Sequence, residues 1–331
     1  MKPVTEPILR AATNAFDFGG PVVCDARHYG EGHINDTFVV WREDHSKRFI
    51  LQRINTDTFT DPVGLMENVC GVTRHLREKI LAAGGDPARE TLNVIPTLSG
   101  AACHLDAEGG AWRAYDFVEN TICLQQVGSE ADFRTVAETL GKFQNQLADY
   151  PASTLHETIA RFHDTPNRYA NFEKALSADA LGRAKDIAPE VAFIHAREKD
   201  CHALLDLLAA GEIPLRVTHN DTKLNNVMID NKTGKGLCVI DLDTVMPGSA
   251  LYDYGDSIRF GASTAAEDEQ NLDLVSCDMN LFEIYTKGYT EGCAGSLTEK
   301  EIRLMPMGAK LMTLECGLRF LTDYLDGDHY F

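Results

Sequence analysis

The chain has 331 residues, 44% of them hydrophobic and 24% charged, and this composition argues against a disordered polypeptide. Its formal net charge of −19 argues against a general nucleic-acid binder, because neutralising phosphates requires clustered Lys and Arg. No apolar run approaches the roughly 18 residues of a membrane helix, and nine scattered cysteines without a C-x-x-C pair argue against a zinc site or a disulfide framework.

The N-terminal residues show no targeting signal. The start MKPVTEPILRAATNAF has neither a basic n-region nor a long apolar stretch, so no signal peptide is expected. We therefore predict a cytoplasmic protein with no membrane partner and no nucleic-acid partner, and the sequence leaves its oligomeric state open. Most cysteines are expected to be buried as small hydrophobic residues.

Residues 1–119 are expected to form one lobe of strands with a single long helix. A short helix is predicted from Glu6 to Phe16, and the runs VVCDARHY, DTFVVWR and RFILQRI then predict three strands of an antiparallel meander. Apolar residues at helical spacing from Val63 to Ile80 predict the long helix. Two further strands, ACHLDA and AWRAYDFVE, follow around the turn EGG.

Residues 120–331 are expected to form a second, mostly helical lobe. Helical patterns run through FRTVAETLGKFQNQLAD, through a polar stretch from about Asn167 to Ala210, and again beyond Pro247. Three short strands interrupt them, LRVTH, NVMID and LCVID, and the turn NKTGKG joins the last two as a hairpin. The expected fold class is α+β, with an antiparallel-sheet N-terminal lobe and a helical C-terminal lobe separated by a cleft.

The short strands end on loops that carry Asp or Asn, where chemistry usually lies. Asp221 is followed two residues later by Lys223 and five residues later by Asn226, and Asp241 ends a strand twenty residues after Asp221. Phosphoryl transfer needs a carboxylate that accepts the hydroxyl proton, a cation beside the transferred group, and oxygen ligands for Mg²⁺. Alone, Asp221 would be a turn or N-cap residue, but this spacing favours catalysis.

The motif HNDTKLNN has the H-x-D-x-K-x-x-N spacing of the protein-kinase catalytic loop, and VIDLD stands where that fold carries its metal-binding Asp. With Asn220 after the histidine, and IDLD in place of D-F-G, the sequence resembles the small-molecule branch of the fold: aminoglycoside phosphotransferases, choline kinases and homoserine kinases. The segments GHINDTF, FILQRIN, YDYGDSIRFGAS and RFLTDYLDGDHYF narrow the resemblance to the N-acetylhexosamine 1-kinase group.

The resemblance implies a two-lobed protein-kinase-like fold that uses ATP and Mg²⁺ and phosphorylates the anomeric hydroxyl of a small-molecule substrate, GlcNAc or GalNAc. It implies catalytic roles for Asp221 and Lys223. It also implies metal contacts for Asn226 and Asp241, and leaves Asp243 as either a second metal ligand or a capping residue.

The resemblance further implies nucleotide and sugar contacts. Arg53 stands where protein kinases have a Lys, with Gln52 on the other face of the strand. The expected nucleotide-binding residues are Gly30, Gly32, Asn35, Arg53, Tyr115, Phe117 and Val118. The expected substrate-binding residues are His33, Asp36, Arg319 and Tyr330. By contrast, Asp253 and Asp256 are expected to make helix-dipole and capping interactions, with Arg259 as a pairing partner of one of them.

Two alternatives stay open. The first keeps the chemistry and changes the acceptor to choline, homoserine or an aminoglycoside, and a cationic acceptor of this kind would need additional carboxylates. The second is a non-catalytic pseudo-kinase that binds ATP without turnover. The presence of Asp221, Asn226 and Asp241 argues against this second alternative.

Overall fold

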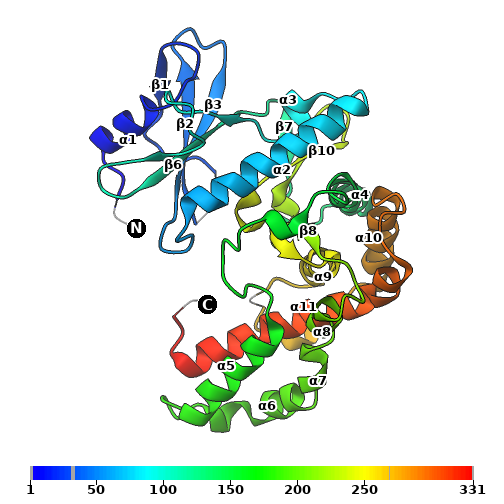
Figure 1. Ribbon diagram of the computed structural model, residues 1–331. Coiled ribbons are helices and arrows are strands. Elements are labelled where there is room, and N and C mark those ends of the chain that lie inside the picture. The colour runs from blue at the N-terminus through cyan, green and yellow to red at the C-terminus, as the bar shows by residue number, and fades with distance from the viewer. Residues whose placement is uncertain (1–2, 31–33, 268, 330–331) are drawn as a thin grey trace. The chain divides into compact units, whose positions relative to one another are not determined.

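The computed structural model describes residues 3–30, 34–267 and 269–329 (Figure 1). The chain divides into two compact units, each built from three stretches of sequence. The first unit contains Met1–Cys123, Thr154–Ile159 and Val227–Met246, and the second contains Leu124–Ser153, Ala160–Asn226 and Pro247–Phe331. The single boundary expected after residue 119 therefore leaves out two later segments that pack with the first unit.

The main sheet of the first unit is antiparallel throughout. Its strand order is β1-β2-β3-β6-β4, and β5 also pairs with β6. The predicted meander is confirmed, whereas β4 was missed because two residues carry no readable alternation. The strands are β1 (Val22–Cys24), β2 (Asp36–Arg42), β3 (Arg48–Ile54), β4 (Val94–Ile95), β5 (His104–Leu105) and β6 (Ala111–Asp116).

Two helices flank this sheet. The predicted N-terminal helix is α1 (Glu6–Thr13), which packs on one face in a core of buried residues that includes Phe38, Phe49, Leu51 and Trp112. The long helix α2 (Pro62–Ala82) lies on the other side of the sheet (Figure 1). Asp61 caps α2 by accepting the backbone N–H of Gly64, and α3 (Pro87–Glu90) follows.

A second antiparallel sheet of this unit leads into the loop that begins at Asp241. Its order is β10-β9-β7, and the predicted hairpin of β9 and β10 is confirmed. The strands are β7 (Thr121–Cys123), β9 (Val227–Asp230) and β10 (Gly236–Val239). The hairpin brings residue 241 and the short 3₁₀ helix η4 (Leu242–Thr244) directly after β10.

The second unit is mostly helical, as expected. Its longer helices are α4 (Glu130–Gln146), α5 (Thr165–Ala178), α6 (Ala188–His195), α9 (Ala250–Gly261), α10 (Met279–Gly292) and α11 (Glu299–Asp326). Shorter pieces are α7 (Glu198–Cys201), α8 (Leu205–Ala209), η2 (Ala184–Ile187), η3 (Leu224–Asn226) and η5 (Leu272–Leu274), with η1 (Ala152–Thr154) at its boundary. A two-stranded sheet is formed by β8 (Arg216–Thr218) and β11 (Met246–Gly248).

In the second unit, the helices α9 and α11 pack closely against each other. At Gly255, on α9, an added Cβ would lie 2.3 Å from the backbone oxygen of Gly308 on α11. Only glycine allows the helix backbones to approach so closely. This contact matters for the site, because α9 supports the catalytic-loop motif described below.

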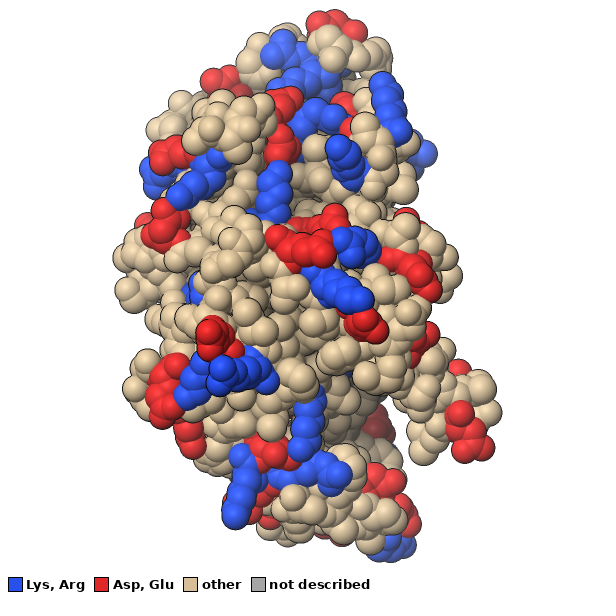
Figure 2. All heavy atoms as spheres, turned by 90° about the vertical axis from the view of Figure 1, so that its right-hand side faces the viewer, with Lys and Arg blue, Asp and Glu red and all other residues tan. Residues whose placement is uncertain are grey.

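Within residues 3–30, 34–267 and 269–329, no helix is both long and apolar enough to cross a bilayer. On the face shown in Figure 2, acidic and basic side chains alternate, and the blue side chains form no continuous field. This face therefore offers no broad basic surface of the kind that nucleic acids require.

Candidate active site

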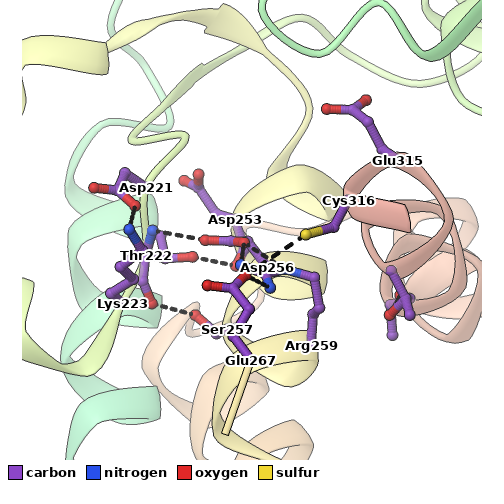
Figure 3. Close-up of polar contacts among 12 residues, drawn as sticks. Asp221, Thr222, Lys223, Asp253, Asp256, Ser257, Arg259, Glu267, Glu315 and Cys316 are labelled. Carbon is purple, nitrogen blue, oxygen red and sulfur yellow. Dashed lines mark hydrogen bonds and ion pairs between the residues drawn. The ribbon is translucent and has the colours of Figure 1, made fainter. Parts of the chain in front are cut away.

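The predicted catalytic loop follows β8 in the second unit and brings three of the predicted side chains together. The Nζ atom of Lys223 lies 3.3 Å from Oδ1 of Asp221 (Figure 3). The side-chain amide nitrogen of Asn226 donates to the Asp221 backbone oxygen at 2.8 Å and to its Oδ2 at 3.3 Å. Asp221 and Lys223 are partly exposed, with side-chain exposures of 29% and 41%, so both remain accessible to a ligand.

The charge of Lys223 is favoured by its surroundings. Burial opposes the ammonium form, but the carboxylates of Asp221 and Asp256 outweigh burial and raise the pKa of Lys223. Lys223 therefore carries its positive charge at neutral pH beside the proposed base. Within the described loop, Asn220 has a left-handed backbone (φ 65°), a conformation that Asn tolerates better than most residues.

Two aspartates of α9 hold the backbone of this loop. Asp253 accepts the backbone N–H groups of His219 at 2.9 Å and Asn220 at 2.7 Å, and its backbone oxygen accepts the Thr222 hydroxyl at 2.6 Å. Asp256 accepts the N–H of Thr222 at 3.2 Å (Figure 3). The capping role expected from the sequence is therefore incomplete: these carboxylates satisfy buried N–H groups of a loop that lies 33 to 34 residues earlier.

Asp253 is buried, and burial raises the pKa of its carboxyl group, although His219 and the two N–H donors oppose that rise. The expected pairing of Arg259 is confirmed: its Nε and NH2 atoms donate to Asp256 at 3.1 and 2.9 Å. Arg259 also pairs with Glu267, which accepts the thiol of Cys316 at 3.5 Å. The loop is thus supported by a connected set of charged groups rather than by isolated turns.

A second buried charge pair lies in the same unit. His163 Nδ1 is 2.9 Å from Glu315 Oε1, and the Thr165 hydroxyl donates to Glu315 Oε2 at 2.6 Å. The side chains of His163 and Glu315 are 10% and 3% exposed. Burial opposes the imidazolium form, but Glu315 outweighs burial and raises the pKa of His163, while His163 lowers the pKa of Glu315 against its own burial.

This pair predicts a pH dependence of stability. The folded pKa of His163 lies above its ordinary 6.5, so its stabilising contribution is complete below pH 6.5 and is lost as pH rises through the folded pKa. We expect the difference in Tm between wild type and His163→Asn to shrink from pH 5 to pH 9. The control is His195→Asn, whose side chain is 45% exposed beside Glu173. A His163 difference that is constant with pH would contradict this prediction.

The first unit carries the other predicted metal-binding residues. Asp241 is exposed, and its backbone is left-handed (φ 58°, ψ 59°), which is uncommon for a residue other than glycine. Asp243 is 3% exposed and is held by Arg113, whose NH2 donates to Oδ2 at 3.0 Å and whose NH1 pairs with Oδ1. The amide nitrogen of Asn35 also donates to Asp243 Oδ2, at 2.7 Å.

The residues proposed to hold Mg²⁺ have suitable chemistry. The side-chain nitrogen of Asn226 is used by Asp221, which leaves its amide oxygen as the group suited to a cation, and Asp241 is an exposed carboxylate. Oxygen donors of these kinds are those that Mg²⁺ prefers. Among the residues that the structure describes, no three His, Cys, Asp or Glu side chains gather as a metal cluster.

The predicted substrate residue Asp36 of β2 and the predicted nucleotide residue Arg53 of β3 are register partners and lie on the same face of the sheet. Arg53 Nε donates to Asp36 Oδ2 at 3.0 Å, and the Arg53 guanidinium lies 6.0 Å from the centre of the Trp112 ring. Arg53 is two residues after Leu51, so both point to the face that α1 covers. Gln52 points to the opposite face. The pairing of Arg53 with Asp36 does not favour direct ligand contacts, and their roles stay predictions.

The end of β6 and the residues that follow it are well packed. Tyr115 and Val118 are 5% and 4% exposed, and burial raises the pKa of the Tyr115 hydroxyl. The ring of Phe117 lies under the guanidinium of Arg48 at 3.6 Å and contacts Tyr29 edge-on at 5.9 Å. The predicted adenine contacts of Tyr115, Phe117 and Val118 are not tested by these contacts.

The remaining predicted residues lie at the glycine-rich turn and on α11. Gly30 has φ 80°, and a Cβ there would meet no atom within 4 Å, so the turn itself requires glycine. Arg319 is half-buried on α11, one turn after Glu315, and its charge helps to lower the pKa of Arg168, for which burial is the larger cause. Gly32, His33 and Tyr330 lie outside the described residues.

Sequence reasoning missed Arg113. It stands in the middle of β6, a strand of otherwise apolar or aromatic residues up to Tyr115, and its side chain is 2% exposed. A charged residue in a buried strand requires a partner. That signal was readable in AWRAYD, but the partner, 130 residues later in the chain, was not.

Comparisons with known proteins agree with this architecture. A model of a phosphotransferase enzyme family matches residues 25–276. A microcompartment-associated aminopropanol kinase is similar with a TM-score of 0.56 and 15% identity, covering 97% of this chain and 94% of that one. A spectinomycin phosphotransferase solved with ADP and spectinomycin has a TM-score of 0.53 and 13% identity, covering 98% and 88%.

An aminoglycoside phosphotransferase from Alicyclobacillus acidocaldarius has a TM-score of 0.53 and 12% identity, covering 98% of each chain. At these identities the likeness shows the fold. The predicted fold class is confirmed: an antiparallel-sheet N-terminal region and a helical C-terminal region, as in these kinase-like structures.

Proposed function

This chain belongs to the phosphotransferase enzyme family, and we propose that it transfers the γ-phosphoryl group of ATP to the anomeric hydroxyl of an N-acetylhexosamine. The single observation that carries the proposal is the contact of Asp221 with Lys223 and Asn226 within one loop. These side chains supply the carboxylate, the ammonium and the amide oxygen that phosphoryl transfer needs.

The proposed reaction assigns one task to each group. Asp221 accepts the proton of the anomeric hydroxyl as that oxygen bonds to the γ-phosphorus and the bond to the bridging oxygen of ATP breaks, releasing ADP. Lys223 offsets negative charge on the transferred group. Asn226 and Asp241 would hold Mg²⁺, which when bound orients the phosphates and offsets their charge. The product is the sugar 1-phosphate.

The acidic groups around the loop support an uncharged acceptor. Asp256 and Glu267 share Arg259 (Figure 3). Asp253 accepts backbone N–H groups, and Glu315 pairs with His163. Each of these four carboxylates already has a donor or a cation. A choline-like or ammonium-bearing acceptor requires a carboxylate without such a partner, because a buried cation must be compensated. A hydroxyl-rich neutral molecule makes no such demand.

The second candidate acceptor is an amino alcohol. It is favoured by the likeness to the aminopropanol kinase, which at 15% identity reflects the fold alone. Because the four carboxylates around the loop already have partners, we consider an amino alcohol a weaker candidate than the sugar. A pseudo-kinase without turnover would lack a use for Asp221.

The proposal is tested by ³¹P NMR of the protein with Mg·ATP and, in separate tubes, GlcNAc, GalNAc, choline, homoserine and aminopropanol. We expect a new proton-coupled phosphate resonance of a sugar 1-phosphate in one or both sugar tubes. Transfer to an amine-bearing acceptor would replace the substrate and keep the chemistry. ATP binding without turnover on any acceptor would favour the pseudo-kinase.

Arg319→Ala is expected to raise the KM for the sugar about tenfold with little change in kcat, because we propose that its guanidinium donates to the acetamido carbonyl, a contact equally strong in ground and transition states. The measurement is steady-state kinetics at saturating ATP. The control is Arg303→Ala on the same helix, whose side chain is 79% exposed. An unchanged KM in Arg319→Ala would remove this residue from the proposed sugar site.

A further inference from the structure

We infer that Arg113 and Asp243 are positioning residues that fix the 241–246 loop and thereby set the place of Asp241. The inference rests on the proposed function for its use, since Asp241 is there proposed to hold Mg²⁺. It assigns Asp243 a different task from the metal contact predicted from the sequence. All the residues involved belong to the first unit.

The 241–246 loop begins in an unfavourable backbone conformation. Asp241 is left-handed, and a residue with a Cβ holds that conformation only when neighbouring contacts impose it. The residue is also exposed, so its own burial does not supply the constraint. The residues that follow it in the loop make contacts that can supply such a constraint.

Those residues are attached to the unit at several points. Both carboxylate oxygens of Asp243 accept from Arg113, and its backbone oxygen accepts the Thr158 hydroxyl at 2.7 Å. The backbone oxygen of Val245 accepts from Asn68 of α2 at 3.0 Å. The loop is therefore tied to β6, to α2 and to the 154–159 segment.

Arg113 is itself held in one orientation. Its Nε donates to Gln52 Oε1 at 3.0 Å, and the Gln52 amide nitrogen donates to the Thr37 hydroxyl at 3.0 Å. Gln52 and Thr37 are register partners on β3 and β2, and Gln52 and Arg113 are register partners on β3 and β6. A row of side chains across three strands thus aims the guanidinium fork at Asp243.

Asn35 completes the arrangement on the other side of the carboxylate. Its amide nitrogen donates to Asp243 Oδ2 at 2.7 Å, and its amide oxygen accepts the backbone N–H of Asn55 at 2.9 Å. Both carboxylate oxygens of Asp243 therefore accept hydrogen bonds, from a bidentate guanidinium and from an amide, and these contacts hold Asp243 in place. Asp241, two residues earlier, is the exposed carboxylate that the proposed function assigns to the cation.

The variants that test this inference are Arg113→Met, Asp243→Asn and the double variant Arg113→Met/Asp243→Asn. The double variant leaves no unpaired buried charge, so it keeps the inference testable where a single variant fails to fold. Arg53→Met is the matched control for backbone exchange, because Arg53 is also a buried arginine of this sheet, 7% exposed and paired with Asp36, but lies on the other face.

The first readout is amide hydrogen exchange, which needs no activity. We expect the two single variants and the double variant to speed exchange within residues 241–246 at least tenfold, with residues 219–226 unchanged, and Arg53→Met to leave the 241–246 amides as in wild type. Because the two residues act as one pair, the double variant should show no more than the larger single effect. Wild-type exchange at 241–246 in the double variant would overturn the inference.

The second readout is Mn²⁺ affinity, titrated by electron paramagnetic resonance in the presence of ADP. Positioning predicts that Arg113→Met and Asp243→Asn weaken Mn²⁺ binding by a similar factor, about tenfold. A metal-ligand role for Asp243 predicts the opposite pattern: Asp243→Asn loses binding, while Arg113→Met keeps or tightens it because the carboxylate is released. That pattern would overturn the inference.

These readouts separate this inference from the proposed function. If wild type transfers phosphate to none of the acceptors while exchange at 241–246 still depends on Arg113, the proposed function fails and the role of the pair in ordering the loop stands. If phosphate is transferred to a sugar while exchange and Mn²⁺ affinity are unaffected in the double variant, the inference fails alone.

Discussion

Asp221→Asn is expected to lower kcat by a factor on the order of 10² to 10⁴, with the dissociation constant for ATP changed less than about twofold. The amide has the size of the carboxylate but accepts no proton from the acceptor hydroxyl. The loop should survive the substitution, because Asn226 also donates to the backbone oxygen of residue 221, and Asp253 holds the preceding backbone.

The measurement is single-turnover phosphate transfer together with a separate nucleotide-binding titration. Asp206→Asn is a matched control on the same unit, since its side chain is 72% exposed and contacts only His202 among the ion pairs of the described chain. Equal ADP release by Asp221→Asn and wild type would remove Asp221 as the base. Loss of nucleotide binding together with activity would point to a collapsed loop instead.

Glu301→Ala is expected to lower the free energy of unfolding of the second unit by about 3–5 kcal/mol. The Glu301 side chain is fully buried and accepts from Arg216 at 2.6 and 2.8 Å. It also accepts the backbone N–H of Thr298 at 2.8 Å, which caps α11. Removing it leaves Arg216 as a buried charge that still donates to the Ser296 backbone oxygen but has lost its carboxylate.

Urea unfolding followed by far-ultraviolet circular dichroism measures this loss. Glu299→Ala, two residues away and 87% exposed, is the matched control and should change stability by less than about 0.5 kcal/mol. Arg216→Met/Glu301→Leu should recover most of the loss, because no unpaired charge stays buried. A Glu301→Ala variant as stable as Glu299→Ala would show that the pair is solvated and contributes little. Because Arg216 opens β8, which leads into the catalytic loop, reduced kcat is also expected.

The longer elements could be predicted from the sequence because local periodicity determines them. The meander of β2 and β3, the long α2 and the β9–β10 hairpin all carry alternation or helical spacing over several residues. Short elements carry too few residues for a pattern, and so β4 and β7, with two and three residues, were missed. The N-terminal helix was predicted three residues too long, to Phe16, whereas it ends at Thr13.

In the candidate site too, contacts between near neighbours in the sequence could be predicted, and contacts between distant segments could not. Asp221, Lys223 and Asn226 lie within six residues, so their spacing alone predicted that they meet. The support of that loop by Asp253 and Asp256 was not readable, because it depends on α9 folding back more than 30 residues later. The expected metal contact of Asp243 likewise came from its spacing to Asp241, whereas its engagement with Arg113 comes from a strand 130 residues away.

The sequence by itself determined the order of sheet and helices, the family and the reactive loop, because each rests on neighbours in the chain. Only the tertiary structure decided which charged side chains contact the reactive loop and which form ion pairs elsewhere in the fold. In the sequence, Arg53 and Arg113 are both single charged residues within strands, and nothing there distinguishes their partners. In the sheet, Arg53 points toward α1 and pairs with Asp36, whereas Arg113 points to the other face and pairs with Asp243. Such pairing depends on which face a strand presents and what packs against it, and these are set only when distant segments meet.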